Sequence, residues 1–117
     1  MNKINQDEIP DIISAEIPEI KREISELSRE NLAGALQVVV SYIRDRITVH
    51  EIAKVIYSIS LVGWIYNCGN ERVKDLIENL FVRSFNGMRK LCSQYEWGLI
   101  EKRIPIKLLT VYTKQQY

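Results

Sequence analysis

Apolar residues recur at spacings of three and four along most of the chain, which is the pattern of helices with one buried face. The first such stretch covers residues 1–28. Pro18 must kink or break it, because proline lacks a backbone N–H and clashes with the preceding turn. Its apolar stripe consists of Ile9, Ile13, Ile17, Ile20, Ile24 and Leu27. We predict a kinked N-terminal helical segment over 1–28 and a main bundle over 29–117.

The main bundle begins with a predicted helix over about residues 29–47. Ser28 is its expected cap, because a serine hydroxyl can accept from a free N–H of the first helical turn. Thr48 and Glu51 then fit a capping box, in which each side chain bonds to a backbone N–H near the other. The next helix therefore begins at about residue 49 and runs to residue 67.

The helix predicted over 49–67 carries apolar residues on two sides. One side continues the regular core stripe, and a second stripe follows it at spacings of four and three, made of Tyr57, Leu61 and Trp64. A helix that is apolar on two sides is normally covered on two sides. We therefore expect this helix to lie in the middle of the domain.

A further long helix is predicted over residues 70–92, directly after a short turn. Gly69 suits the left-handed residue that ends a helix, and Asn70 can cap the next one. So short a turn makes the two helices an antiparallel hairpin. Two short helices follow, one around Trp97 and one beginning at Pro105. The predicted fold is all-α: residues 1–117 form a single domain, a compact bundle of five or six helices around this central hairpin.

Charge is nearly balanced over the chain as a whole but unevenly distributed along it. The 117 residues carry a formal net charge of +1, which argues against a dedicated nucleic-acid binder. Eight acidic and four basic residues fall in residues 1–30, a net of −4, which leaves +5 for the rest. Either the acidic segment packs against the basic one, or the basic residues form a partner-binding face. That face would contain Arg89, Lys90, Lys102, Arg103, Lys107 and Lys114.

The sequence predicts a cytoplasmic location. The N-terminus has no apolar core of a signal peptide, and the most apolar stretch, over 52–66, is too short to span a membrane. Cys68 and Cys92 do not form a disulfide framework and are expected as free thiols. We expect no membrane partner.

No pattern of reactive residues points to an enzyme. His50 is the only histidine, and its neighbours Thr48 and Glu51 are explained as cap residues. Cys68 and Cys92 lie at opposite ends of one predicted helix and are too far apart to share a metal ion. We therefore predict no catalytic, cofactor-binding or metal site, and no cofactor.

Three polar residues are candidates for recognition. Asn79, Arg83 and Asn86 are spaced i, i+4 and i+7, so they project from one side of a helix beside its apolar stripe. Either Asn79 bridges neighbouring helices while Arg83 lies in solvent, or the row contacts a ligand or partner. Trp64 and Trp97 leave the same choice between core residues and exposed interface anchors.

One segment resembles a known family. The run YNCGNERVKDLIENLFVRSF, over residues 66–85, resembles a family of small all-helical bacterial proteins of unknown function, in which a Gly–Asn turn precedes a Val-Lys-rich helix. Asn79, Phe81 and Ser84 stand at the family's asparagine, aromatic and serine, whereas Arg83 stands where an aromatic is expected. The likeness covers about residues 32–91. It implies a helical fold and a bacterial origin, and the family members look similar to immunity-type proteins that accompany bacterial toxins.

These observations together predict a non-enzymatic protein-binding module, with an immunity-type protein that occludes a toxin as its specific form. The expected partner contacts are Asn79, Arg83, Asn86, Arg89, Lys90, Lys102 and Arg103. Two alternatives stay open. One is a nucleic-acid-associated regulator that uses the basic C-terminal surface. The other is a structural homodimer that buries the stripe of Tyr57, Leu61 and Trp64.

Overall fold

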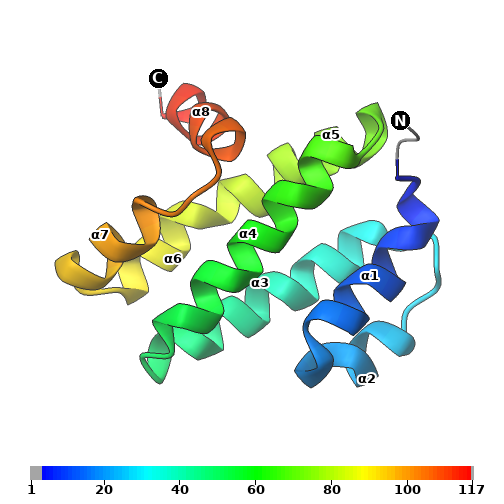
Figure 1. The fold of residues 1–117 in the computed structure, drawn as a ribbon, viewed down its shortest axis with the longest axis horizontal. Helices are drawn as coiled ribbons and strands as arrows, with labels where there is room; N and C mark the ends of the chain where they lie inside the picture. The colour runs from blue at the N-terminus through cyan, green and yellow to red at the C-terminus, as the bar shows by residue number, and fades with distance from the viewer. Residues whose placement is uncertain (1–3, 117) are drawn as a thin grey trace.

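The predicted all-α class is confirmed by the computed structural model, which describes residues 4–116 (Figure 1). Within those residues helices make up the fold, and the only β-type pairing is one isolated bridge. The α-helices are α1 (Ile9–Glu16), α2 (Lys21–Ser25), α3 (Leu32–Thr48), α4 (Ile52–Cys68), α5 (Glu71–Leu76), α6 (Phe85–Leu91), α7 (Gln94–Glu101) and α8 (Ile106–Gln115). Shorter helical turns are η1 (Gln6–Glu8), η2 (Pro18–Ile20), η3 (Ile77–Phe81) and η4 (Val82–Ser84).

The break in the N-terminal segment occurs where proline requires it. α1 ends at Glu16, Ile17 leaves the helical region with φ −127° and ψ 79°, and Pro18 begins the turn that leads to α2. The predicted apolar stripe is buried, with Ile9, Ile13, Ile17, Ile20 and Ile24 each no more than 5% exposed. Residues 9–25 are therefore two short helices, α1 and α2, with the break at Pro18.

The start of α3 lies three residues later than predicted. Asn31 caps it, not Ser28, since the Asn31 Oδ1 atom accepts a 2.8 Å hydrogen bond from the Gly34 N–H. Ser28 lies in the preceding turn, where its backbone carbonyl accepts from the Asn31 N–H. From the sequence, Ser28 and Asn31 are both plausible caps. The first helical residue is Leu32, whose side chain is only 1% exposed, so Asn31 is the residue that precedes the helix and caps it.

The predicted capping box at the α3–α4 turn is wrong. α3 continues through Thr48, so the Thr48 hydroxyl donates to the Asp45 carbonyl of its own last turn. Glu51 precedes α4 without a side-chain cap, and its carboxylate pairs with Arg46 and Lys54. The chain reverses at His50, which has a φ of 62°, a left-handed conformation that is uncommon for a residue with a Cβ.

α3 is the helix that occupies the middle of the fold. It packs against α1, α2, α4, α5, α6 and η3, whereas α4 packs against α1, α3, α7 and α8. The prediction that α4 is covered on two sides is therefore wrong for its aromatic stripe. Leu61 is 8% exposed, but Tyr57 and Trp64 are each 51% exposed. The two arms of the predicted hairpin reverse direction as expected (Figure 1), yet each packs more on α3 than on the other.

The turn between α4 and α5 uses glycine for space, not for a left-handed conformation. Gly69 has φ −78° and ψ 159°, so that prediction is wrong. A Cβ on Gly69 would lie 2.8 Å from the Cβ of Val73, too close for any larger residue. Asn70 caps α5 as predicted, since its Oδ1 accepts from the Val73 N–H at 3.0 Å. Ile4 closes over this turn by donating its N–H to the Cys68 carbonyl at 2.7 Å.

The long helix predicted over 70–92 is not a continuous α-helix. Its core residues step by four, from Val73 through Ile77 and Phe81 to Phe85, and all four are fully buried. In an α-helix, with about 100° per residue, each four-residue step would rotate the side chain by about 40° away from the core. The π-helical turn over η3 has more residues per turn than an α-helix, so it offsets this drift between Ile77 and Phe81 and helps to keep the four residues on one face.

The C-terminal helices close the remaining side of the core. Ser93 and Glu96 form a capping box at the start of α7, and Trp97 is buried, as one of the two alternatives for it required. Pro105 lies against Gly63 of α4, where an added Cβ would be 2.8 Å from the Pro105 Cβ and closer still to its Cγ. This close approach positions α8 above α4.

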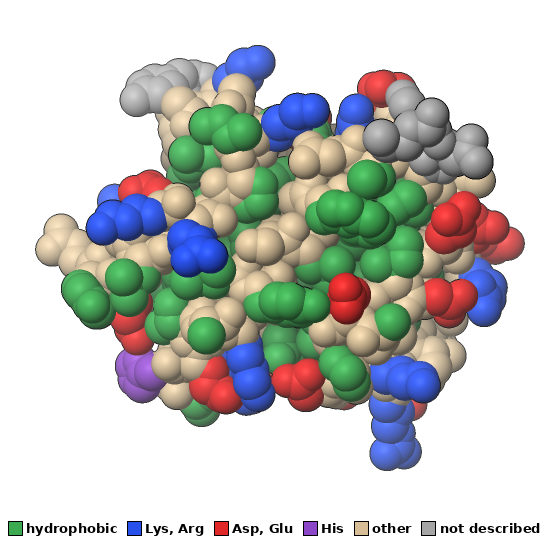
Figure 2. Space-filling view, in the orientation of Figure 1, with side chains coloured by type: hydrophobic (Ala, Val, Ile, Leu, Met, Phe, Trp, Pro, Cys, Tyr) green, Lys and Arg blue, Asp and Glu red, His purple; other side chains and the backbone are tan. Residues whose placement is uncertain are grey.

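The acidic and basic parts of the chain do not neutralise each other. Among residues 4–116, the ion pairs of the first 30 residues are local, as in Asp11–Arg29, or reach α4, as in Glu19–Lys54 at 3.3 Å. On the face that Figure 2 shows, acidic side chains lie at the edge over the N-terminal helices with basic ones among them, and both kinds occur elsewhere on that face. Within residues 4–116, no ion pair joins the acidic N-terminal segment to the basic residues near the C-terminus.

Candidate functional site: a basic groove between η3 and α8

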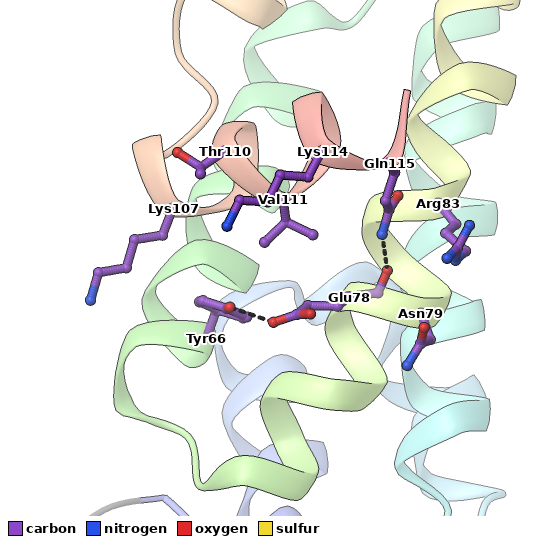
Figure 3. A pocket seen from close by; sticks show the side chains of 9 residues that line it. All are labelled: Tyr66, Glu78, Asn79, Arg83, Lys107, Thr110, Val111, Lys114 and Gln115. Atoms are coloured by element: carbon purple, nitrogen blue, oxygen red, sulfur yellow. Dashed lines mark hydrogen bonds between the residues drawn. The ribbon is translucent and has the colours of Figure 1, made fainter. Parts of the chain in front are cut away.

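An open groove of about 620 Å³ lies where α8 crosses the irregular segment η3 (Figure 3). α8 contributes one wall, η3 and the following turn contribute the other, and the end of α4 closes one side. The lining side chains are Tyr66, Glu78, Asn79, Arg83, Lys107, Thr110, Val111, Lys114 and Gln115.

Three cations surround this groove. Arg83 comes from η4, Lys107 and Lys114 come from α8 about two turns apart, and all three are exposed. Within residues 4–116, none of them has a carboxylate oxygen within 4.0 Å. The three cations therefore outnumber the acidic residues of the lining, and none of them forms an ion pair within the described part of the chain.

Glu78 is the one acidic residue in the groove lining, and a neighbouring hydroxyl engages it. The Tyr66 hydroxyl donates to the Glu78 Oε2 atom at 2.6 Å (Figure 3). Burial raises the pKa of Tyr66 to about 12, and the hydrogen bond to Glu78 acts in the same direction. Tyr66 therefore stays protonated at neutral pH and keeps donating to the Glu78 carboxylate, which lies in the groove lining together with the three cations.

The π-helical turn of η3 creates the contact that holds α8 over the groove. In an α-helix the Val82 N–H would bond to the Glu78 carbonyl, but here it bonds to the Ile77 carbonyl, one residue further back. The freed Glu78 carbonyl instead accepts from the Gln115 Nε2 atom of α8 at 2.9 Å (Figure 3). The irregular backbone thus supplies one of the hydrogen bonds that hold α8 beside the groove.

The row Asn79, Arg83 and Asn86 divides between two roles. Asn79 and Arg83 line the groove, although the Asn79 amide donates to the Asp75 carbonyl of its own helix at 2.8 Å. Asn86 does not line it. Its Oδ1 accepts from the Tyr112 hydroxyl at 2.7 Å and its Nδ2 donates to Gln116 at 3.3 Å, so Asn86 fastens α8 to α6.

The other predicted contact residues lie outside this groove. Arg89 and Lys90 are exposed in the last turn of α6, and Lys102 and Arg103 are exposed just after α7. Sequence reasoning placed Lys107 and Lys114 on a basic face but not among the expected contacts. Their spacing with Thr110 and Val111, at i, i+3, i+4 and i+7, is the signal that could have shown all four to share one face of α8.

His50 has a different partner from the one expected. Its Nδ1 atom lies 2.7 Å from the Glu96 Oε2 atom of α7, instead of contacting the neighbouring cap residues. The Ser93 backbone N–H, together with His50, lowers the pKa of Glu96 below its usual range. This contact joins the α3–α4 turn to α7.

The fold and groove define a class: an all-α protein with an open groove whose lining includes three cations. Among residues 4–116 there is no group of three or more His, Cys, Asp or Glu side chains that could hold a metal ion. No helix in the same range is both long enough and apolar enough to cross a bilayer.

The chain belongs to the family described as Domain of unknown function (DUF7674), whose model matches residues 10–117. This match confirms the predicted membership in a family of unknown function. Comparison with curated proteins and with solved structures finds no match for the chain.

Proposed function

We propose that this chain is a non-enzymatic protein-binding module whose groove between η3 and α8 takes an acidic segment of a protein partner. The observation that supports the proposal is the presence of Arg83, Lys107 and Lys114 in the lining of one groove, none of them with a carboxylate within 4.0 Å in residues 4–116. Complementary charge gives an interface its specificity and speeds association.

The groove favours a protein segment because its chemistry is mixed. Arg83 carries a planar guanidinium, which can bind a carboxylate through two parallel hydrogen bonds. The lysines supply less directional charge, while Val111 and the ring of Tyr66 offer apolar contact beside them. An acidic peptide backbone with intervening apolar side chains satisfies both features. Arginine and tyrosine are also among the residues that contribute most to protein interfaces.

The proposed mode of action is steric and electrostatic occlusion, so no bond chemistry is part of it. In its immunity-type form, the chain would cover an acidic surface of a toxin and prevent that surface from reaching its target. The wider basic surface of Arg89, Lys90, Lys102 and Arg103 would then steer the partner toward the groove over longer distances.

The test is affinity capture from the native host with three versions of the chain. The wild type is compared with Arg83→Glu/Lys114→Glu and with a control, Lys21→Glu/Arg22→Glu, which makes the same charge change on exposed residues of α2. Protein and nucleic acid are both assayed after washes at low and at moderate salt. We expect one protein to be retained stoichiometrically at moderate salt by the wild type and the control, and lost from the groove variant.

Other outcomes separate the alternatives. Nucleic acid that is retained at low salt and released steeply as salt rises supports the nucleic-acid-associated regulator and contradicts the proposal. A protein that the groove variant retains as well as the wild type does contradicts the location of the site. A partner lost from the control as well shows that overall charge, not the groove, determines binding.

A further inference from the structure

α4 carries a line of exposed residues without a single charge. Positions 53, 57, 60, 64 and 67 are all exposed and follow spacings of four and three, so they form one continuous face of the helix. We name it the α4 stripe; its members are Ala53, Tyr57, Ser60, Trp64 and Asn67. Charged residues make up 26% of the chain, so an exposed face about 21 Å long without a charge is unusual. Such a face favours contact with another molecule over contact with solvent.

The stripe is bordered by a hollow that is mainly apolar. The hollow has a volume of about 570 Å³ and lies between α1 and α4, with Ile12, Ala15 and Leu61 in its lining beside Tyr57 and Trp64. Hydrophobic side chains gather over α4 and α1 on this face (Figure 2). The exposed aromatic rings therefore belong to a larger apolar patch and are not isolated surface residues.

We propose that the α4 stripe is the interface of a two-fold symmetric dimer of this chain, with the two α4 helices antiparallel. Large and small residues alternate along the stripe, which is what two copies of one helix need in order to interdigitate. In the antiparallel arrangement Trp64 packs over Ser60 of the second copy, and Tyr57 packs beside Asn67 of the second copy. The pattern thus complements itself.

The charges around the stripe favour a second copy over a foreign charged partner. Glu16 is the one charged residue lining the hollow, and its carboxylate already accepts from the Tyr57 hydroxyl at 3.3 Å. At the other end, the Lys54 ammonium lies 3.3 Å from Glu19 and 3.2 Å from Glu51. Lys54 is thus paired within one chain, and the stripe itself carries no charge that would favour a different, charged molecule over a second copy.

The area available sets the strength of the dimer. With Tyr57 and Trp64 each 51% exposed, the two side chains present about 200 Å² per copy, hence about 400 Å² across the interface. Specific stable interfaces bury about 1,200 Å² or more in total, so the surrounding hollow must contribute and the interface stays at the low end. We expect a reversible dimer that dissociates on dilution.

The test is sedimentation equilibrium over a wide range of concentrations. The wild type should shift from 13.7 kDa at low concentration toward twice that mass at high concentration. Ser60→Arg places a charge and a long side chain at the centre of the stripe without removing a core contact, because Ser60 is exposed. It should raise the dissociation constant of the dimer about ten-fold or more. Trp64→Asp should do the same if it folds.

A matched control and a second observable complete the test. Tyr95 is an exposed aromatic on α7, 75% exposed, so Tyr95→Asp should leave dimerisation unchanged. With 5-fluorotryptophan, the two tryptophans give two fluorine NMR signals, and only that of Trp64 should shift with concentration, because Trp97 is buried. A wild type of 13.7 kDa at all concentrations overturns the proposal, as does a dimer that Ser60→Arg leaves intact. Neither result bears on the groove at η3.

Discussion

The α4 stripe and the groove at η3 show how backbone regularity decides what a surface can recognise. α4 is a regular helix, so its exposed residues repeat at spacings of four and three and can match the same residues in another copy. η3 is irregular, and its freed carbonyl holds α8 over a groove that contains no repeat. A repeating, uncharged face suits self-association, whereas a unique, charged groove suits a different molecule.

The largest expected effect is a separation of the two surfaces by mutation. Arg83→Glu/Lys114→Glu should weaken binding of the acidic partner about 100-fold, because each reversed charge replaces attraction with repulsion. The same variant should dimerise like the wild type. Ser60→Arg should do the opposite, so titration calorimetry with the purified partner and sedimentation of each variant measure both effects. Loss of both properties in either variant would show that the two surfaces are coupled.

The second effect concerns Gly63, the glycine of α4 that packs against the start of α8. Gly63 on α4 contacts Pro105, which leads into α8, so Gly63→Ala should force the proline ring away and destabilise the fold by about 1–3 kcal/mol. Gly98 is the matched control, since a Cβ there meets nothing within 4 Å. Gly98→Ala should stabilise α7 by about 0.5–1 kcal/mol. Urea unfolding of both variants measures the difference, and equal effects would contradict the close approach.

A smaller effect is expected from the side chains that hold α8 in place. Asn86→Ala removes the acceptor of the buried Tyr112 hydroxyl, and Gln115→Ala removes the donor to the Glu78 carbonyl. Each should destabilise the docking of α8 by about 1 kcal/mol. Hydrogen exchange should then quicken in α8 while α4 keeps its protection. Equal acceleration in both helices would mean that α8 does not open independently of α4.

The smallest effect depends on pH. The pKa of Glu96 is lowered by the Ser93 backbone N–H and by His50, so its ionised form stabilises the folded state. For a lowered carboxyl pKa, this stability is present above the usual glutamate pKa and disappears as the pH falls through the folded-state value. Glu96→Gln should therefore lower the melting temperature at pH 7 and have little effect at pH 3. A melting-temperature difference between Glu96→Gln and the wild type that grows toward pH 3 would contradict this prediction.

The sequence predicted those features of the fold that depend on local chemistry. A proline in the interior of a helix, such as Pro18, interrupts that helix whatever the rest of the fold. Asn70 indicates a helix start because its side chain caps the first turn, and Pro105 because its ring cannot continue a preceding helix. The turn at His50 was not predicted in this way, although histidine adopts the left-handed conformation more often than most residues with a Cβ. Gly69 illustrates the reverse case: its residue type is explained by the nearby Val73 side chain and not by its dihedral angles.

Long-range contacts account for most of what sequence reasoning missed at the candidate site. Nothing local indicates that Gln115 bonds to a carbonyl 37 residues earlier, or that Tyr66 engages Glu78. Hydrophobicity alone also misplaced α4, since Tyr57 and Trp64 are as apolar as core residues yet lie half exposed. The pattern shows that a residue is apolar, but only the tertiary structure shows whether the domain itself covers it.

The π-helical turn at η3 also has a consequence for how this chain is compared with its relatives. A π turn accommodates one more residue than the α-helical turn it replaces, so it behaves as a single-residue insertion within an otherwise helical segment. A family member with a continuous α-helix here should align with a one-residue gap between positions 77 and 81. In a member with this gap, no free carbonyl corresponds to the Glu78 carbonyl that accepts from Gln115. The gap would therefore distinguish family members without the groove from members that have it.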